Sequence, residues 1–202
     1  MSVSPAFRRR RTLTLAAAAA AAGALTLTAC GSGGTSGGSG DTKFVTGTGG
    51  IATVAKGDRQ NAPELSGETV DGKQLDVASL KGKVVVLNVW GSWCAPCRAE
   101  APYLAKVSKE MKAKGVEFVG INTRDTDKGP AQQFEKEFGV DYPSLYDPIG
   151  KLILRFPKGS LNPQAIPSTI VLDKNGKIAA RALMALDDTK LHQMIDPLIA
   201  EK

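Results

Sequence analysis

The feature that most constrains the fold of this chain is an apolar segment that leads directly into a pair of cysteines. Residues 83–90 read KVVVLNVW, and residues 93–97 read WCAPC. A short apolar run rich in β-branched residues is typical of a central strand that is buried on both faces. Such strands occur in α/β proteins, in which helices cover the sheet and connect parallel neighbours.

The segments around this run predict the other elements of an α/β domain. Asp71-Gly72 predicts a hairpin turn between residues 69–70 and 74–75, because this turn requires positive φ. Apolar runs predict further strands at 116–121, 168–172 and 177–182. Helical periodicity with start and stop signals predicts helices at 94–114, 130–138 and 188–201.

Prolines interrupt residues 140–165, where only 152–154 suggests a short helix. The order of elements is hairpin, strand, helix, strand, helix, strand hairpin and helix. This order implies an α/β fold with a mixed central sheet flanked by helices and an N-terminal β-hairpin extension.

The first thirty residues have the form of an export signal. Four arginines at positions 8–11 precede an apolar stretch at 13–27, which is short for a membrane span. The arginines leave both the general and the twin-arginine export routes open. We predict a signal peptide over residues 1–29.

Residues 27–31, LTACG, resemble the lipobox of bacterial lipoproteins, in which the cysteine becomes the lipidated first residue of the mature chain. The resemblance implies that Cys30 carries a lipid anchor on the extracytoplasmic face of the cell membrane. A plain secretory signal with an incidental cysteine is the alternative. The Gly/Ser-rich sequence that follows predicts a flexible tether over residues 30–57 and a folded domain over 58–202.

The formal net charge of +6 is concentrated in the signal segment. Lys and Arg total 26 against 20 Asp and Glu, and without residues 1–30 the basic residues number 22. A mature charge near +2 provides no electrostatic footprint for nucleic acid, so no such partner is expected.

Cys94 and Cys97 follow the buried strand and open the next helix. Two cysteines three residues apart in a helical first turn are neighbours, so a disulfide can form and break with little backbone movement. The helix N-terminus stabilises a thiolate at Cys94, which makes it the attacking residue. Cys97, deeper in the helix, then resolves the mixed disulfide. The pattern indicates a redox-active disulfide.

Other interpretations of the two cysteines fit the sequence less well. A structural zinc site needs two more ligands, for which only Cys30 and His192 are available. A static disulfide gains little from closing so short a loop. Peroxiredoxins carry Pro seven positions and Thr or Ser three positions before their cysteine, where this chain has Leu87 and Gly91. A metal-binding or metallochaperone module is the alternative from a non-enzymatic class. We expect neither a metal nor another cofactor.

Residues 89–102, VWGSWCAPCRAEAP, resemble the active-site stretch of the TlpA/ResA-like branch of thioredoxin-like proteins. The similarity extends over residues 60–200 and includes Asn122-Thr123 and residues 166–173, IPSTIVLD. It implies a thioredoxin-like fold and a thiol-disulfide oxidoreductase that acts on protein disulfides.

The resemblance also implies roles for residues that match the family's motifs. Pro167 occupies the place of the family's cis-proline, which lies against the active-site disulfide. Trp93, Pro96 and Ile166 are, with Pro167, the expected substrate contacts. Glu100 matches a family carboxylate that is thought to tune the thiol pKa or to move protons.

Two departures from thioredoxin itself bear on the chemistry. Asn88 stands where thioredoxin has a buried acid, and we expect it to satisfy buried hydrogen bonds. Ala95-Pro96 places no charge between the two cysteines. We therefore predict a reduction potential of about −200 to −270 mV, rather than the oxidising value near −120 mV.

Our leading hypothesis is a reductant of exported protein disulfides, which we expect to be monomeric. For this reductant the resemblance suggests a membrane electron donor of the CcdA/DsbD type. Apocytochrome c cysteines before haem attachment are an implied substrate class. Because exported proteins become oxidised, a reductant there needs a supply of electrons. A disulfide-forming oxidase of the same fold is the alternative enzyme, since similar exported domains can act in that direction.

Overall fold

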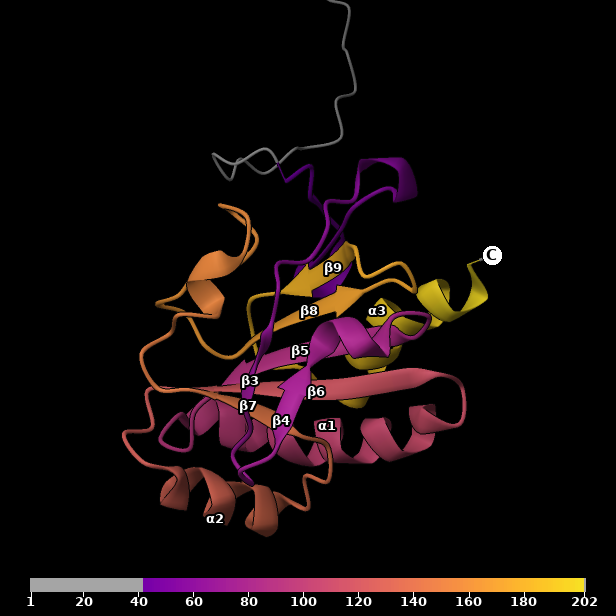
Figure 1. Ribbon diagram of the computed structural model, residues 1–202. Coiled ribbons are helices and arrows are strands. Elements are labelled where there is room, and N and C mark those ends of the chain that lie inside the picture. Colours follow the sequence, from indigo (N-terminus) through magenta and orange to yellow (C-terminus); the bar gives the residue numbers. More distant parts are fainter. Residues whose placement is uncertain (1–41, 202) are drawn as a thin grey trace, which may run out of the picture. The chain divides into compact units, whose positions relative to one another are not determined.

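The computed structural model describes residues 42–201, which form one mixed sheet with helices and a separate hairpin (Figure 1). The sheet has the strand order β1-β2-β9-β8-β5-β6-β7. Its strands are β1 (Val45–Thr46), β2 (Ile51–Thr53), β5 (Val84–Trp90), β6 (Val116–Thr123), β7 (Ser144–Asp147), β8 (Ser168–Leu172) and β9 (Ile178–Ala182). The separate hairpin consists of β3 (Ser66–Glu68) and β4 (Gln74–Asp76), and the α-helices are α1 (Ala95–Lys112), α2 (Lys128–Phe138) and α3 (Asp188–Ala200).

The predicted central strand is confirmed as β5. All seven of its residues are buried. It pairs in parallel with β6, so that Trp90 lies opposite Asn122, and antiparallel with β8, so that Asn88 lies opposite Thr169. These registers place the carboxyl ends of β5 and β6 and the start of β8 at the same end of the central strands.

Different elements cover the two faces of the sheet. Figure 1 shows the β3–β4 hairpin in front of the sheet and α3 behind it. On the helical face, side chains of α1 and α3 pack on the sheet: Val84, Val86, Leu104, Val107, Met111, Phe118, Val171, Leu191, Met194 and Ile195. On the other face, the 3-10 helix η4 (Ile153–Arg155) and the segments around the hairpin cover the sheet: Leu65, Val77, Val85, Leu87, Val119, Ile121, Ile153 and Leu172.

Helix ends follow the signals in the sequence. Cys94 is the N-cap of α1, and Gly115 beyond its end adopts φ 79°. Asp127 caps α2 by accepting from the amide of Gly129, and Gly139 ends that helix in the left-handed region with φ 66°. The three predicted helices are therefore confirmed to within a few residues.

Strand β7 was not expected from the sequence. Only four residues long, it lies between Pro143 and Pro148 and pairs in parallel with β6 at the edge of the sheet. Prolines are tolerated next to an edge strand because no ladder hydrogen bond is lost there. The predicted short helix at 152–154 is η4, displaced by one residue.

The predicted end of the tether at residue 57 is wrong. β1 and β2 lie within that range, and β2 pairs with β9 so that Ala52 faces Arg181. Phe44, Ala52 and Val54 are buried in the core. The ordered domain therefore includes residues from 42 onwards, because these few apolar side chains complete one edge of the sheet.

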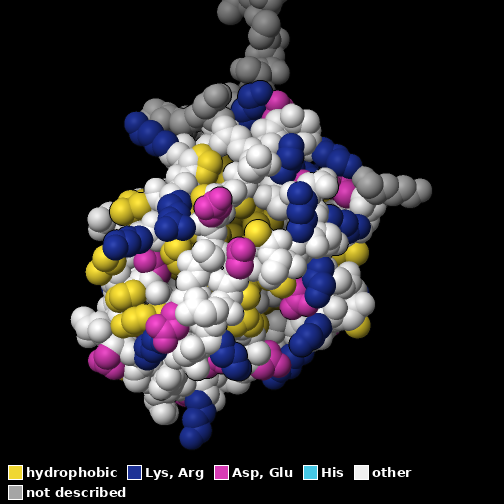
Figure 2. Space-filling view, viewed as in Figure 1, with side chains coloured by type: hydrophobic (Ala, Val, Ile, Leu, Met, Phe, Trp, Pro, Cys, Tyr) yellow, Lys and Arg dark blue, Asp and Glu magenta, His cyan; other side chains and the backbone are white. Residues whose placement is uncertain are grey.

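The predicted signal peptide, Cys30 and the first part of the tether lie outside the described residues. Within residues 42–201, no helix has the length and apolar character needed to cross a bilayer. Basic and acidic side chains are interspersed over the face shown in Figure 2.

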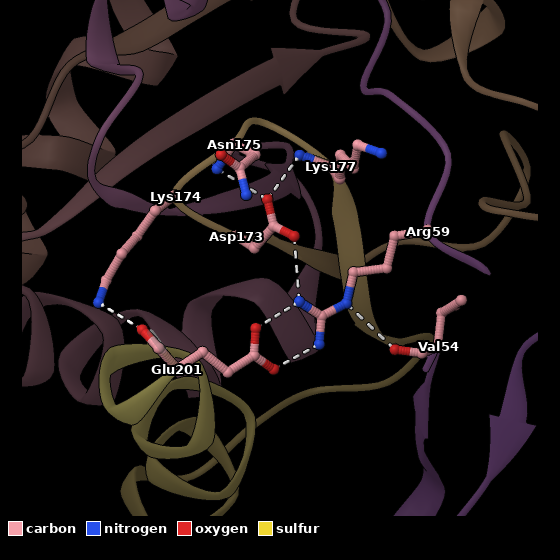
Figure 3. A network of polar contacts seen from close by, with 7 residues as sticks. All are labelled: Val54, Arg59, Asp173, Lys174, Asn175, Lys177 and Glu201. Carbon is pink, nitrogen blue, oxygen red and sulfur yellow. Dashed lines mark hydrogen bonds and ion pairs between the residues drawn. The ribbon is translucent and has the colours of Figure 1, made fainter. Parts of the chain in front are cut away.

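Arg59 forms a buried ion-pair network that joins three distant parts of the domain (Figure 3). Its guanidinium donates to Asp173 in the β8–β9 turn over 3.0 Å and to both carboxylate oxygens of Glu201 over 2.6 Å. Its Nε donates to the carbonyl of Val54 over 3.1 Å. Lys174 donates to the carbonyl of Glu201 just after α3. The network therefore fastens the N-terminal segment and the last helix to the sheet.

We expect Arg59→Met to lower the free energy of unfolding by about 3 kcal/mol, because it leaves the buried Asp173 carboxylate without its cation. Urea unfolding monitored by circular dichroism measures this loss. The control Lys106→Met breaks an ion pair with Asp188 whose side chains are 63% and 38% exposed. It should cost far less than Arg59→Met, because solvent screens an exposed ion pair. Equal losses in the two variants would contradict a structural role for the network.

Candidate active site

Cys94 and Cys97 form a disulfide at the start of α1, with their Cα atoms 5.2 Å apart. Cys94 is the N-cap residue, and Cys97 lies in the first helical turn. The exposed fractions of the two residues are 4% and 1%, so Cys94 is the more accessible cysteine, as expected for the attacking residue.

The helix start favours negative charge on Cys94 when the disulfide is reduced. The backbone N–H of Cys97 donates to the Cys94 sulfur over 3.2 Å. No acidic residue lies in the first turn of α1. Because the N-terminal N–H groups and the helix dipole stabilise a thiolate, the geometry suits a nucleophilic Cys94.

The expected substrate contacts surround Cys94. The peptide bond between Ile166 and Pro167 is cis, as the family resemblance implied, and the carbonyl oxygen of Ile166 lies 3.8 Å from the Cys94 sulfur. The Trp93 side chain is 52% exposed, and Pro96 is exposed as well. The fold thus brings residues about seventy positions apart to the two sides of one sulfur.

Trp90 belongs to the apolar cluster that contains the two cysteines. Its indole stacks on Phe134 of α2 with ring centroids 4.3 Å apart, and its Nε1 donates to the hydroxyl of Ser144 over 3.3 Å. Gly120 makes room for the indole, since a Cβ there would lie 2.6 Å from Nε1. Trp90 is therefore a core residue that packs in the same cluster as the two cysteines.

Glu100 lies one helical turn after Cys97 and is only 1% exposed. Burial raises the pKa of its carboxyl to about 7, and two hydrogen bonds partly oppose this rise. The backbone N–H of Leu186 donates to one oxygen over 2.9 Å, and Asn88 Nδ2 donates to the other over 2.8 Å. Glu100 can therefore hold or release a proton near neutral pH beside the dithiol.

Asn88 satisfies buried hydrogen bonds, as the sequence analysis predicted. Besides its bond to Glu100, Nδ2 lies 3.2 Å from the hydroxyl of Thr169 on the neighbouring strand. The amide therefore links the centre of β5 to α1 and β8. In this chain the buried acid lies on the helix, and the strand supplies its neutral partner.

Asp125 is a site residue that the sequence analysis missed. It is 4% exposed and accepts three hydrogen bonds. Ser92 donates through its backbone N–H over 2.9 Å and its hydroxyl over 2.5 Å, and Asn122 Nδ2 donates over 2.6 Å. Asp125 thereby positions the loop that carries Trp93 and Cys94. Its place two residues after β6 was the only available signal, because Ser92, which donates two of the three hydrogen bonds, is 33 positions away in the sequence.

Glu135 on α2 is a partly buried carboxyl that the sequence did not indicate. Burial raises its pKa to about 7, and a hydrogen bond with the Ser144 hydroxyl opposes the rise. Ser144 also accepts a hydrogen bond from Trp90. Glu135 is therefore linked through Ser144 to the indole that packs in the cluster of the two cysteines. A glutamate in the middle of an amphipathic helix resembles a solvent-facing residue in sequence, so nothing marked it.

The comparison with protein families decides the assignment. Residues 55–195 match the family described as Redoxin. The chain belongs to the redoxin family.

Individual relatives of this redoxin carry thiol-disulfide chemistry in their names. Thiol-disulfide oxidoreductase ResA of Bacillus subtilis (strain 168) is 31% identical over 136 residues, which cover 67% of this chain and 73% of the relative. A DsbF homologue from Corynebacterium diphtheriae is 38% identical, with a TM-score of 0.69, and the match covers 75% of this chain and 95% of that one. A secreted thiol-disulfide isomerase from Corynebacterium glutamicum is 34% identical, with a TM-score of 0.72, covering 80% and 99%.

These relatives and the Cys94–Cys97 disulfide identify this redoxin as a thiol-disulfide oxidoreductase of thioredoxin-like fold. The fold and the enzyme class expected from the sequence are thereby confirmed. Cys30, the predicted lipidation site, lies outside the described residues. His192 lies on α3, 3.6 Å from Glu110 and 3.4 Å from Asp196.

Glu100 should make the stability of this redoxin fall as the pH rises. Its pKa is about 7 in the folded state, against an ordinary value of 4.5. The stability that the bound proton provides is present below about pH 4.5 and is lost as the pH rises through 7. Glu100→Gln stays neutral, so its free energy of unfolding should gain on wild type by up to about 3 kcal/mol between pH 5 and 8.

Urea unfolding of the oxidised protein at several pH values measures this difference. Glu64→Gln, which changes an exposed carboxyl outside the site, is the matched control and should follow the wild-type pH profile. Parallel profiles for wild type and Glu100→Gln would show that Glu100 does not titrate in this range.

Proposed function

We propose that this redoxin is an exported, lipid-anchored reductant of protein disulfides, with Cys94 as the attacking sulfur. The observation that carries the proposal is the hydrogen bond from the Cys97 N–H to the Cys94 sulfur at the N-terminus of α1. It stabilises a thiolate on the more accessible cysteine and leaves the other cysteine in position to resolve.

The proposed cycle begins with both cysteines reduced. The Cys94 thiolate attacks one sulfur of a substrate disulfide, the substrate S–S bond breaks, and the released substrate thiolate takes up a proton. Cys97, after losing its proton, attacks the Cys94 sulfur of the mixed disulfide and releases the second substrate thiol. Two electrons and two protons have then passed to the substrate, and the Cys94–Cys97 disulfide has formed.

We assign Glu100 to the proton transfer at Cys97. It lies three residues further along the same helix, where side chains at positions i and i+3 are neighbours. Its pKa of about 7 lets it accept the Cys97 proton when the mixed disulfide is resolved and return it when the disulfide is reduced again. Asn88 and the Leu186 amide hold the carboxyl in place.

We infer the direction of electron flow from the dipeptide between the two cysteines, and the partners from the family resemblance. Ala95-Pro96 adds no charge that would stabilise the reduced form further, which favours a reducing potential. The resemblance to the TlpA/ResA-like branch supports a membrane electron donor of the CcdA/DsbD type and apocytochrome c cysteines as a substrate class. The LTACG segment supports lipidation of Cys30. The described structure begins at residue 42, and a fully extended chain from residue 30 to that point spans at most about 40 Å.

The second candidate is a disulfide-forming or isomerising enzyme of the same fold. One relative favours it: the Corynebacterium glutamicum protein, at 34% identity, is named a secreted thiol-disulfide isomerase. The geometry of the dithiol serves both directions of exchange, because the same two bonds form and break in reverse. The reduction potential and the redox state in cells separate the two candidates.

The reduction potential of the pair is expected between about −200 and −270 mV. Equilibration of the purified protein with glutathione buffers, followed by alkylation of free thiols, measures it. A value above about −150 mV would favour the oxidase instead. Alkylation in cells is the companion measurement, in which a mostly reduced pair supports the reductant and a mostly oxidised pair supports the oxidase.

Cys97→Ser should accumulate mixed disulfides between Cys94 and its substrates, because no resolving thiol is present. Non-reducing electrophoresis of cell extracts, followed by mass spectrometry, identifies the trapped proteins. The control Cys94→Ser removes the attacking sulfur and should trap far fewer partners. Equal trapping by the two variants would overturn the assignment of Cys94 as the nucleophile.

A further inference from the structure

Arg124 lies at the rim of the active site in an uncommon backbone conformation. It follows β6 directly, at the edge of the sheet where β5 leads into the Cys94 loop. Its φ is 60°, in the left-handed region that few residues other than glycine adopt. Such conformations persist where the surroundings fix them, and they cluster at functional sites. The side chain is exposed.

The Arg124 side chain contacts both segments that flank the dithiol: Trp93 on one side, and the loop before the cis Ile166–Pro167 bond on the other. Its guanidinium carbon lies 5.6 Å from the centre of the Trp93 ring, in a cation–π contact. Its NH2 group donates to the carbonyl of Pro163, in the loop that leads to the cis Ile166–Pro167 bond. A chain attached to Cys94 through a mixed disulfide must pass between these flanks, and therefore close to the guanidinium.

Arg124 carries a positive charge without a carboxylate partner in the part of the chain that the structure describes. Asp125, its neighbour in sequence, points inward and binds Ser92 and Asn122. Arg98, which also lies close to the disulfide in sequence, pairs with Glu137 over 2.7 Å. One carbonyl satisfies only one of the five guanidinium N–H donors, so Arg124 can still receive a carboxylate.

We propose that Arg124 is a specificity-determining residue that selects protein disulfides with an Asp or Glu next to the reactive cysteine. This proposal rests on the function proposed above and names a substrate class for it. The substrate carboxylate binds the free edge of the guanidinium while the substrate sulfur reacts with Cys94. The cation–π contact with Trp93 keeps the guanidinium beside Cys94, and its N–H groups that are not bonded to Pro163 are available to a carboxylate. A purely structural role for Arg124 would fix Trp93 but would not discriminate between substrate charges.

The test compares three peptide disulfides that differ only in the residue next to the reactive cysteine: Glu, Gln or Lys. The reduced full-length protein should react with the Glu peptide about 5-fold faster than with the Lys peptide at low salt, the range of an exposed charge contact. This ratio should approach 1 in 0.5 M NaCl, since salt screens exposed charges. The second-order rate constant of peptide reduction is the measured quantity.

Three variants separate charge recognition from structure. Arg124→Gln should bring the Glu/Lys ratio close to 1, and Arg124→Glu should invert it, which a loss of folding cannot do. Arg155→Gln removes the same charge from η4, where the side chain donates to the carbonyl of Glu64, and should keep the wild-type ratio.

The outcomes also distinguish this inference from the function on which it rests. If wild type does not reduce the neutral Gln peptide, the proposed reductant activity fails and this inference fails with it. If wild type reduces that peptide but Arg124→Glu keeps the same Glu/Lys ratio, only the selection by Arg124 is wrong.

Discussion

The structure depends on the burial of β5 on both faces. Helices α1 and α3 cover one face, and the segments around the β3–β4 hairpin cover the other, so none of the seven residues of β5 can shift without exposing apolar surface. A slip of one residue would move every side chain to the opposite face. The fixed register determines where β5 ends, and the Cys94 loop begins there. The position of the dithiol is therefore a consequence of core packing.

Two buried carboxylates near the dithiol have different surroundings. Asp125 accepts three hydrogen bonds from Ser92 and Asn122, which hold the active-site loop against the end of β6. Glu100 accepts only two, from Asn88 and Leu186, and its pKa is raised by burial. Their hydrogen bonds suit Asp125 to positioning and Glu100 to proton transfer. The same functional group serves two purposes because the two carboxyls have different hydrogen-bond partners.

The sequence predicted the elements whose signals are local. The β-branched run of β5, the glycines after α1 and α2, and the Asp71-Gly72 turn each depend on neighbours within a few residues, and each prediction was confirmed. β1, β2 and β7 were missed because strands of two to four residues carry little periodicity of their own. They exist because the sheet supplies their hydrogen-bond partners.

The amino-acid sequence by itself determined the fold class and the chemistry of the site, since the CxxC spacing and its place between a buried strand and a helix are local properties. The tertiary structure decided which residues surround the two sulfurs. Ile166 contacts the Cys94 sulfur, Asp125 binds Ser92 and Arg124 contacts Trp93, each from a segment that is distant along the chain. Arg59 likewise binds Glu201, which is 142 positions away in the sequence. Long-range contacts of this kind follow from strand register and packing, which no short stretch of sequence encodes.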